Sequence, residues 1–230
     1  MGKGTSKARG STGGGVIIDS SVKLLKMTEE EIDLSSSPLI YGKKDSSLTE
    51  KARAVIENFE REKYNASVEH NMLIDDDGNI IEQNVGKDGE VSASLNARLT
   101  ADVYSHNHNR RAGVLGGTFS DGDMENFIRF NQRTYRATAK EGTYSISKGK
   151  DFDKTGKQFV SDFRKYGNKL FDDTKNRVAK LDAKFSAGKI DYETYIKMHN
   201  KLNNRMFVGL HNWLLKKQKK YNYSYTLEQR

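Results

Sequence analysis

Two histidines followed by an acidic helix start are the residues whose types and spacing best support chemistry. His106 and His108 are separated by one residue, and the segment 120–123 follows after a gap of eleven residues. Side chains two positions apart on an extended backbone point to the same side, so both imidazoles can bind one metal ion. Ser120 and Asp123 are three positions apart, which places them on one side of a first helical turn. The spacing therefore predicts a metal site with His106, His108 and Asp123 as ligands.

The predicted ligand set indicates a catalytic rather than a structural site. Two imidazoles and one carboxylate leave a tetrahedral zinc ion with an open position for a water molecule. A metal hydrolase also needs a base that removes a proton from this water. We expect Glu69, on the first strand of the predicted sheet, to be this base, because Glu82 and Glu90 lie nearer to turns. The predicted cofactor is Zn²⁺, and the predicted reaction is hydrolysis.

These residue types also have ordinary structural interpretations. A serine followed three positions later by an acid, as in Ser120 and Asp123, is common at helix N-caps. His70 is compatible with a plain strand residue, and His199 and His211 lie on helical faces, where we expect them to pack. The paired histidines after a strand, followed by a capped helix with an acid in its first turn, favour metal binding over these interpretations.

The hydrophobic pattern predicts the elements that hold these residues. A helix capped by Thr49 is expected over 48–64, because its apolar residues recur every three or four positions. Strands are expected over 67–74 and 79–82, joined by an acidic Asp-Gly turn. The other elements expected in this region are a short helix over 92–100, a strand over 101–105, a helix that begins at Ser120, and strands over 134–139 and 143–147.

Beyond residue 150 the apolar residues follow a long helical period. They step by threes and fours over 159–185 and again over 192–206, which predicts two helices. Gly188 is the expected stop of the first helix and Asp191 the cap of the second, so the two form a hairpin. A last strand is expected over 221–227. The predicted fold class is α/β, with a mixed β-sheet flanked by helices and a C-terminal helical hairpin.

The positive charge is concentrated in the last third of the chain. The formal net charge is +8, and 18 basic against 9 acidic residues lie in 151–230. We divide the chain into an irregular N-terminal segment (1–47), a metal-binding domain (48–150) and a basic hairpin with a tail (151–230). One basic cluster is followed by alternating tyrosines, which makes it a candidate contact for nucleic acid or an acidic protein surface. Its lysines, which also suit an ordinary solubilising surface, are Lys216, Lys217, Lys219 and Lys220.

The composition excludes several classes of protein. The chain has no cysteine, which rules out disulfides, thiol nucleophiles and cysteine-bound zinc, so a cytoplasmic or virion-associated protein is expected. No stretch approaches the roughly 20 apolar residues that cross a bilayer, and no signal peptide is expected. The start Met1-Gly2 with Ser6 matches an N-myristoylation pattern. We interpret the glycine-rich residues 1–15 as a flexible tail instead.

The site and its strands resemble the JAMM (MPN-plus) metalloproteases, whose pattern is an upstream Glu, His-x-His-Pro and Ser-x-x-Asp. The resemblance is greatest to the bacterial and phage branch, where the pair is often His-Asn-His, and it covers about residues 48–150. It implies a JAMM-like (cytidine-deaminase-like) fold. It also implies zinc held by His106, His108 and Asp123, Glu69 as the general base, and Ser120 as the hydroxyl that supports the oxyanion.

Two features depart from the pattern of this family. Asn109 stands where the family has proline, and the gap between His108 and Ser120 is longer than usual. The extra residues fall in a glycine-rich basic loop over 109–117, which is suited to gating the site or holding an extended peptide. A longer loop need not disturb the ligands, because closure entropy rises slowly with length. The same departures fit a copy of the fold that has lost its activity.

Three functions remain to be compared. The first is a zinc-dependent peptidase or isopeptidase that acts on a peptide or protein. The second is a phage head-morphogenesis (minor capsid) protein, in which the metal domain is a scaffold and the hairpin contacts a capsid or portal partner. The third is an HNH nuclease, which is disfavoured because those nucleases disperse the three letters over a ββα unit. No membrane partner is expected.

Overall fold

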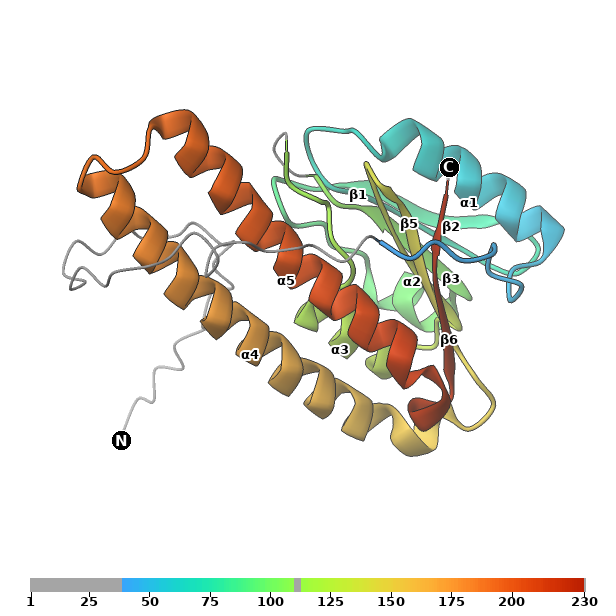
Figure 1. Cartoon of the computed structure of the whole chain (residues 1–230). Coiled ribbons are helices and arrows are strands. Elements are labelled where there is room, and N and C mark those ends of the chain that lie inside the picture. The colour runs from blue at the N-terminus through green and yellow to red at the C-terminus, as the bar shows by residue number, and fades with distance from the viewer. Residues whose placement is uncertain (1–38, 110–112, 230) are drawn as a thin grey trace, which may run out of the picture.

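The computed structural model describes residues 39–109 and 113–229. The predictions for the tail, the myristoylation pattern and the basic residues 110–112 lie outside the described residues. Helices and strands follow the order shown in Figure 1. They are α1 (Glu50–Lys63), β1 (His70–Ile74), β2 (Ile80–Val85), α2 (Leu95–Thr100), β3 (Val103–Asn107), α3 (Asp121–Arg129), β4 (Thr134–Ala139), β5 (Gly142–Lys148), α4 (Phe152–Ser186), α5 (Tyr192–Tyr221) and β6 (Tyr223–Glu228).

A six-stranded mixed sheet forms the centre of the fold. The strand order is β2-β1-β3-β4-β5-β6, and only the central pair β3–β4 is parallel. The α/β class, the mixed sheet flanked by helices and the C-terminal helical hairpin are thereby confirmed. Each expected element is present, and the ends of β4 are as expected. Near the site, β1 starts three residues later than expected, and β3 starts two residues later and continues to Asn107, so that His106 lies inside the strand.

The two faces of the sheet are covered by different elements, as period-two alternation requires. In β3, Val103 packs with α1 in one apolar cluster, whereas Tyr104 packs in a second cluster with α3, α4 and α5. Figure 1 shows α1 on one side of the sheet and the hairpin on the other. His106 shares the face of Tyr104, two positions before it. The site therefore lies on the face that the helical hairpin covers.

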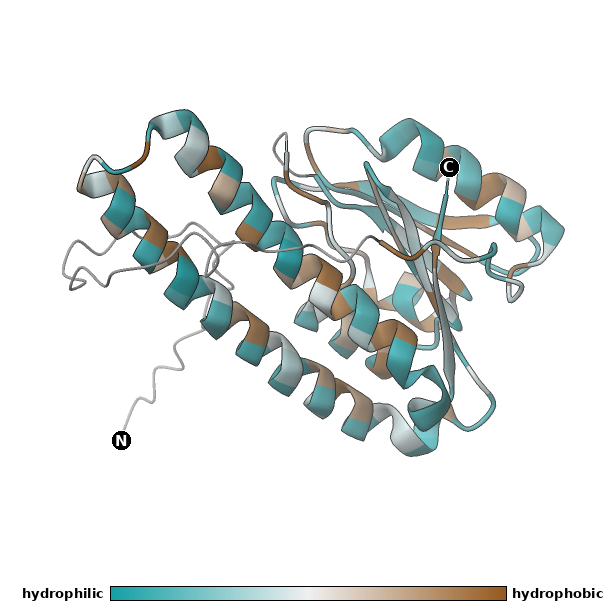
Figure 2. Ribbon diagram, in the orientation of Figure 1, coloured by the Kyte–Doolittle hydropathy of each residue, from teal (hydrophilic) through white to brown (hydrophobic). Residues whose placement is uncertain are grey.

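The helical hairpin shares its core with the sheet at one end only. Phe159 of α4 and Trp213 of α5 belong to the cluster that contains Tyr135 of β4, so apolar packing continues across residue 150. Farther out, the two helices pack on each other through Val178 and Leu202. Figure 2 shows apolar residues recurring along both helices between hydrophilic ones. The expected stop at Gly188 (φ +66°) and the expected cap at Asp191 are both present.

The tyrosines that follow the lysine cluster face the core. Tyr221, Tyr223 and Tyr225 are buried, so they stabilise the sheet and offer no stacking surface for a base. Lys220 of that cluster is paired with Asp162 at 3.1 Å. A contact between these lysines and nucleic acid stays a prediction, but the buried tyrosines cannot contribute to it. Within the described residues, no helix is both long and apolar enough to span a membrane.

A buried ion cluster lies between α1 and the sheet, beside the apolar cluster of Val103. Arg136 of β4 is fully buried, and its guanidinium pairs with Glu60 of α1 (Nε–Oε1 2.7 Å). A second pair joins Arg136 to Glu228 of β6 (Nη2–Oε2 2.8 Å). A buried charge without a partner is costly, so each member of this cluster requires the others. Three elements far apart in the sequence are held together in this way.

We predict that Arg136→Ala lowers the free energy of unfolding by about 3–5 kcal/mol, because it leaves two buried carboxylates without their cation. The matched control is Arg177→Ala, which removes a more exposed i,i+4 pair with Asp173 and should cost about 0.5 kcal/mol or less. Chemical denaturation of both variants measures the difference. Equal losses in the two variants would contradict the role of the buried cluster.

Candidate metal centre

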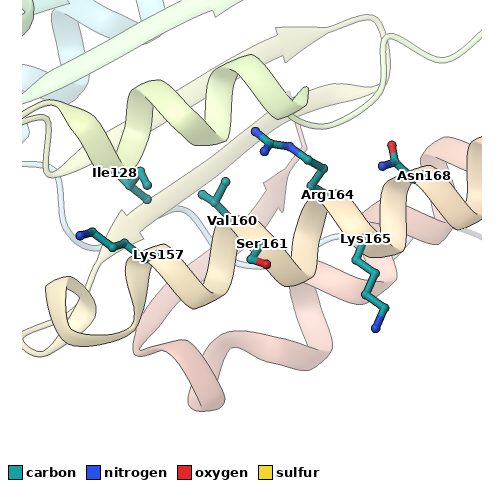
Figure 3. Close-up of a pocket in the computed structure, with 7 residues that line it drawn as sticks. All are labelled: Ile128, Lys157, Val160, Ser161, Arg164, Lys165 and Asn168. Atoms are coloured by element: carbon teal, nitrogen blue, oxygen red, sulfur yellow. The ribbon is translucent and has the colours of Figure 1, made fainter.

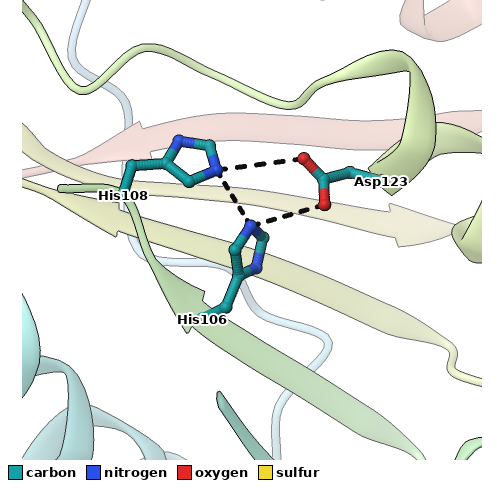
Figure 4. Close-up of side chains that lie close together, drawn as sticks. All are labelled: His106, His108 and Asp123. Atoms are coloured by element: carbon teal, nitrogen blue, oxygen red, sulfur yellow. Dashed lines mark hydrogen bonds and ion pairs between the residues drawn. The ribbon is translucent and has the colours of Figure 1, made fainter. Parts of the chain in front are cut away.

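Strand β3 and helix α3 bring the three predicted ligands together. The Nε2 atoms of His106 and His108 are 2.9 Å apart. The carboxylate of Asp123 places Oδ1 at 3.4 Å from His106 Nε2 and Oδ2 at 3.8 Å from His108 Nε2. Figure 4 shows both rings and the carboxylate pointing toward one centre. These ligand atoms all lie within 4.8 Å of one another, and no other such group of three occurs in residues 39–109 and 113–229.

The extended backbone continues past the end of β3 and sets the direction of both imidazoles. The N–H of His108 donates to the carbonyl of Thr138 at 2.8 Å, which prolongs the ladder with β4. His106 and His108 therefore keep the two-residue alternation and project on the same face. Both histidines are buried, whereas the side chain of Asp123 is 14% exposed. The carboxylate thus lies on the outer side of the group.

The N-cap of α3 fixes the third ligand. Ser120 Oγ accepts from the Asp123 N–H at 3.2 Å, and Asp123 Oδ2 accepts from the Ser120 N–H at 2.7 Å, which forms a capping box. The hydroxyl of Ser120 also donates to Oδ2 at 2.7 Å. Ser120 and Asp123 therefore cap the helix, and this role is compatible with Asp123 as a metal ligand. The cap aims Oδ1 at His106, while the role of Ser120 toward an oxyanion stays a prediction.

Opposite charges in the group shift its proton affinities. Burial alone would raise the pKa of Asp123, but the attraction of His106 and His108 holds it well below its usual value. Burial alone would lower the pKa of His106, but Asp123 and then Glu69 raise it above 6.5. Without a metal, a proton on His106 supplies the positive charge that the carboxylate requires. A metal ion can supply the same charge once that proton has left.

The tautomer of His108 suits metal binding through Nε2. Its Nδ1 lies 3.1 Å from the carbonyl oxygen of Gly117, and a carbonyl can only accept, so Nδ1 carries the hydrogen. In the neutral ring, Nε2 then has a lone pair that faces His106 and Asp123. Histidines that bind metals commonly donate their other N–H to a carbonyl or a carboxylate in this way.

The donor atoms fit a divalent metal ion after a small adjustment. A tetrahedral zinc ion with bonds of about 2.0–2.1 Å separates its ligand atoms by roughly 3.3 Å. The distance of 3.4 Å between His106 Nε2 and Asp123 Oδ1 meets this value, and the two Nε2 atoms must separate slightly from 2.9 Å. Imidazole and carboxylate donors serve zinc and other first-row ions. The buried group can hold a metal ion, and the choice of zinc belongs to the proposal below.

Glu69 lies just before β1, one residue outside the strand on which it was expected. Its backbone still pairs with Lys87 and Gly86, which extends the ladder. The β1–β3 pairing ends at Asn71 and His106. Two-residue alternation from Asn71 would put the Glu69 side chain on the same face as His106. Glu69 is buried, and its charge contributes to the raised pKa of His106. The tertiary structure thus places Glu69 near enough to His106 for its charge to be felt there.

Asn107, the residue between the two histidines, holds the chain on both sides of Glu69. Its Oδ1 accepts from the His70 N–H at 2.6 Å, and its Nδ2 donates to the Val68 carbonyl at 3.1 Å. The poorer candidate Glu82 is engaged elsewhere, since its carboxylate accepts from the Ser94 N–H at 2.8 Å at the cap of α2. Glu69 thus lies next to the strand that carries the histidines, whereas the carboxylate of Glu82 is bound at the start of α2.

Asn109, which stands where the JAMM pattern has proline, links two segments of the chain. Its Nδ2 donates to the carbonyl of Ser67 at 2.7 Å and to Asp88 Oδ1 at 2.9 Å. A proline at this position has no side-chain donor and could form neither bond. The departure from the family pattern therefore has a structural use in this chain.

Two tyrosines that the site prediction did not include form a wall of the centre. Tyr104 and Tyr135 stack at 4.4 Å between ring centroids, and their rings lie 5.4 Å and 5.7 Å from the ring of His106. Burial and then the negative charge of Asp123 raise the pKa of Tyr104, so its hydroxyl stays protonated. The position of Tyr104 two residues before His106 was the sequence signal that could have found it.

His211 and a groove between α3 and α4 lie apart from the centre. His211 is fully buried and contacts Tyr225 Oη at 2.9 Å, which confirms its packing role. A groove of about 430 Å³ between α3 and α4 is lined by several basic side chains (Figure 3). None of the three ligands lines it, and Arg164 within it pairs with Asp121 and Glu125 of α3. This groove is not part of the metal centre.

Comparisons of the chain with protein-family models, with curated proteins and with solved structures gave no match. The resemblance to the JAMM family therefore depends on the residues of the site and on their spacing.

We predict about one metal ion per chain in the purified protein and none in the His106→Ala/His108→Ala double variant, because two of three ligands are lost. Elemental metal analysis measures both. His199→Ala, which removes a histidine in the outer part of the hairpin, is the control and should keep its metal. Stoichiometric metal in the double variant would place the binding site elsewhere.

Metal affinity should fall as the pH is lowered. The metal requires the neutral form of His106, whose pKa is raised above 6.5, so proton competition begins near neutral pH. The pKa of Asp123 is far too low for its carboxylate to compete in this range. One displaced proton corresponds to at most about tenfold weaker binding per pH unit below the raised pKa of His106, and to no change well above it. Chelator competition titrations measure the slope, and a flat profile would contradict the protonation scheme.

Proposed function

We propose that the chain is a JAMM-type zinc metallopeptidase or isopeptidase. The observation that carries the proposal is the convergence of His106, His108 and Asp123 on one point, with the buried Glu69 near enough for its charge to act on His106. Two nitrogen ligands and one carboxylate leave a position free for water or substrate. A buried acid beside that position has the properties of a general base.

The residues divide the work of amide hydrolysis between them. Bound zinc would polarise the scissile carbonyl and lower the pKa of its water. Glu69 takes the proton from the attacking water and later passes it to the leaving amine. His106 and His108 act as neutral donors, and the cap of α3 keeps the carboxylate of Asp123 directed inward.

Ser120 is the proposed donor to the oxyanion of the tetrahedral intermediate. It is exposed at the start of α3, and its hydroxyl donates to Asp123 Oδ2 in this structure. Rotation of the hydroxyl frees it for substrate, while the Ser120 N–H continues to hold the same carboxylate oxygen at 2.7 Å. A donor of this kind contributes on the order of 3 kcal/mol to the lowering of the barrier.

A second candidate function is that of a phage head-morphogenesis protein, in the cytoplasm of a host or in the virion, whose metal domain is a scaffold. The hairpin is the feature that favours it. Between residues 165 and 205 the chain carries ten basic and five acidic side chains, and Phe171 and Tyr192 are 55% and 66% exposed. Basic charge combined with exposed aromatic rings suits contact with a protein surface of opposite charge. In this second candidate function, the hairpin would bind a capsid or portal protein.

We predict that Glu69→Gln lowers the rate of peptide or isopeptide hydrolysis by about 10²- to 10⁴-fold and leaves the zinc content unchanged, because a base is removed and no ligand is lost. Initial rates on a broad peptide panel, with metal analysis of the same samples, measure both effects. The matched control Glu90→Gln makes the same change in the turn after β2 and should keep full activity.

Three results would redirect the assignment. Loss of zinc from Glu69→Gln makes Glu69 a ligand. Equal losses of activity in the Glu69 and Glu90 variants remove Glu69 as the base. A wild-type protein that binds zinc but cleaves nothing on the panel favours the scaffold function.

A further inference from the structure

We propose that Glu141, in the turn between β4 and β5, is a positioning residue of the metal centre. It acts through the backbone of Gly117 on His108 and selects the His108 tautomer that can bind a metal through Nε2. The inference rests on the proposed metal-dependent function. It assigns a role to a side chain that lies 33 residues beyond the predicted ligand His108 in the sequence.

The carboxylate of Glu141 holds two consecutive amides of the glycine-rich loop. Oε2 accepts from the Gly116 N–H at 3.0 Å, and Oε1 accepts from the Gly117 N–H at 2.9 Å. The hydroxyl of Tyr144 in β5 donates to Oε1 at 2.8 Å and fixes the carboxylate in turn. Hydrogen bonds to an ionised acceptor are stronger than those between neutral groups. The end of the loop nearest α3 is therefore anchored to the sheet.

The conformation of Gly117 sets the direction in which its carbonyl group points. Its φ of +81° lies in the left-handed region that favours glycine. A Cβ at this position would lie 2.5 Å from the ring of Phe207 in α5, so a side chain is excluded on that side. The carbonyl of Gly117 accepts from His108 Nδ1 at 3.1 Å. The chain of contacts runs from Glu141 through Gly117 to His108.

The direction of this carbonyl decides which nitrogen of His108 carries the hydrogen. While Nδ1–H is bonded to Gly117, Nε2 keeps its lone pair toward the centre. If the loop turns away, the other tautomer becomes accessible, and an Nε2–H directed into the centre cannot bind a metal. Residues that orient ligands in this way typically change metal affinity by 10- to 100-fold.

The same loop has a second anchor that does not lead to His108. Asn204 of α5 accepts from the Leu115 N–H at 2.8 Å through Oδ1 and donates to the Gly113 carbonyl at 3.1 Å through Nδ2. Asn204 and Glu141 thus each make two bonds to the backbone of one loop. Because Asn204 bonds residues 113 and 115 and not Gly117, Asn204→Ala is a matched control for general loosening of the loop.

The experiment compares Glu141→Ala, Glu141→Gln and Asn204→Ala in the full chain. The first readout is the imidazole ¹⁵N spectrum of the metal-free protein at alkaline pH, with the His108 signals assigned by their absence in His108→Ala. We expect the Nδ1–H tautomer in the wild type and in Asn204→Ala, and a mixture of tautomers in Glu141→Ala. The second readout is zinc affinity from chelator competition.

We expect zinc to bind Glu141→Ala about tenfold more weakly than the wild type. Glu141→Gln, which keeps the size of the side chain and one acceptor oxygen, should fall between them, and Asn204→Ala should stay within about twofold of the wild type. An unchanged His108 tautomer in Glu141→Ala, or equal losses of affinity in the Glu141 and Asn204 variants, overturns the proposal.

Two controls keep the result decisive. Where Glu141→Ala does not fold, Glu141→Gln carries the comparison, and wild-type values in both readouts overturn the proposal. A wild-type protein that binds no zinc refutes the proposed function, whereas the tautomer spectrum still decides the role of Glu141.

Discussion

The buried guanidinium of Arg136 is the interaction on which the arrangement of the sheet depends. A cation in the interior must be fully paired, and Arg136 finds Glu60 on α1 and Glu228 on β6. Glu228 also accepts from the N–H of Asp45 at 2.6 Å, which includes the segment before α1. The centre of the sheet, its last strand and the segment before α1 are thereby held in one register. An apolar core could slide more easily than this cluster of directional bonds.

The ion cluster and the metal centre lie on opposite faces of the same strands. In β3, Ser105 donates to Glu60 at 2.8 Å, while the next residue, His106, faces the metal centre. In β4, Arg136 faces α1, and the residue before it, Tyr135, stacks beside the centre. Because a strand cannot shift by one residue without exchanging its faces, the ion cluster also fixes the register of the ligands. The polar face toward α1 thus stabilises the geometry on which the proposed chemistry depends.

At the centre itself, stability and proposed function use the same bonds. The capping box that begins α3 also orients Asp123, and the ladder that extends β3 also aims His108. Asn107 and Asn109, which alternate with the histidines, connect β3 to the chain beside Glu69 and to Asp88. The short segment His106–Asn109 therefore combines ligands on one side of the strand with structural links on the other.

The sequence by itself determined the local part of this protein. The two-residue spacing of His106 and His108 and the three-residue spacing of Ser120 and Asp123 are consequences of strand and helix geometry, so the ligands could be chosen without the fold. The hairpin and its stop at Gly188 followed from periodicity in the same way. Only the tertiary structure decided the long-range pairings, which are the ion cluster around Arg136 and the link from Glu141 to Gly117. Only it showed that the tyrosines of β6 are buried, because alternation along a strand does not say which face another element covers. The physical reason is that local spacing is fixed by backbone geometry, whereas contacts between distant residues depend on how the elements pack.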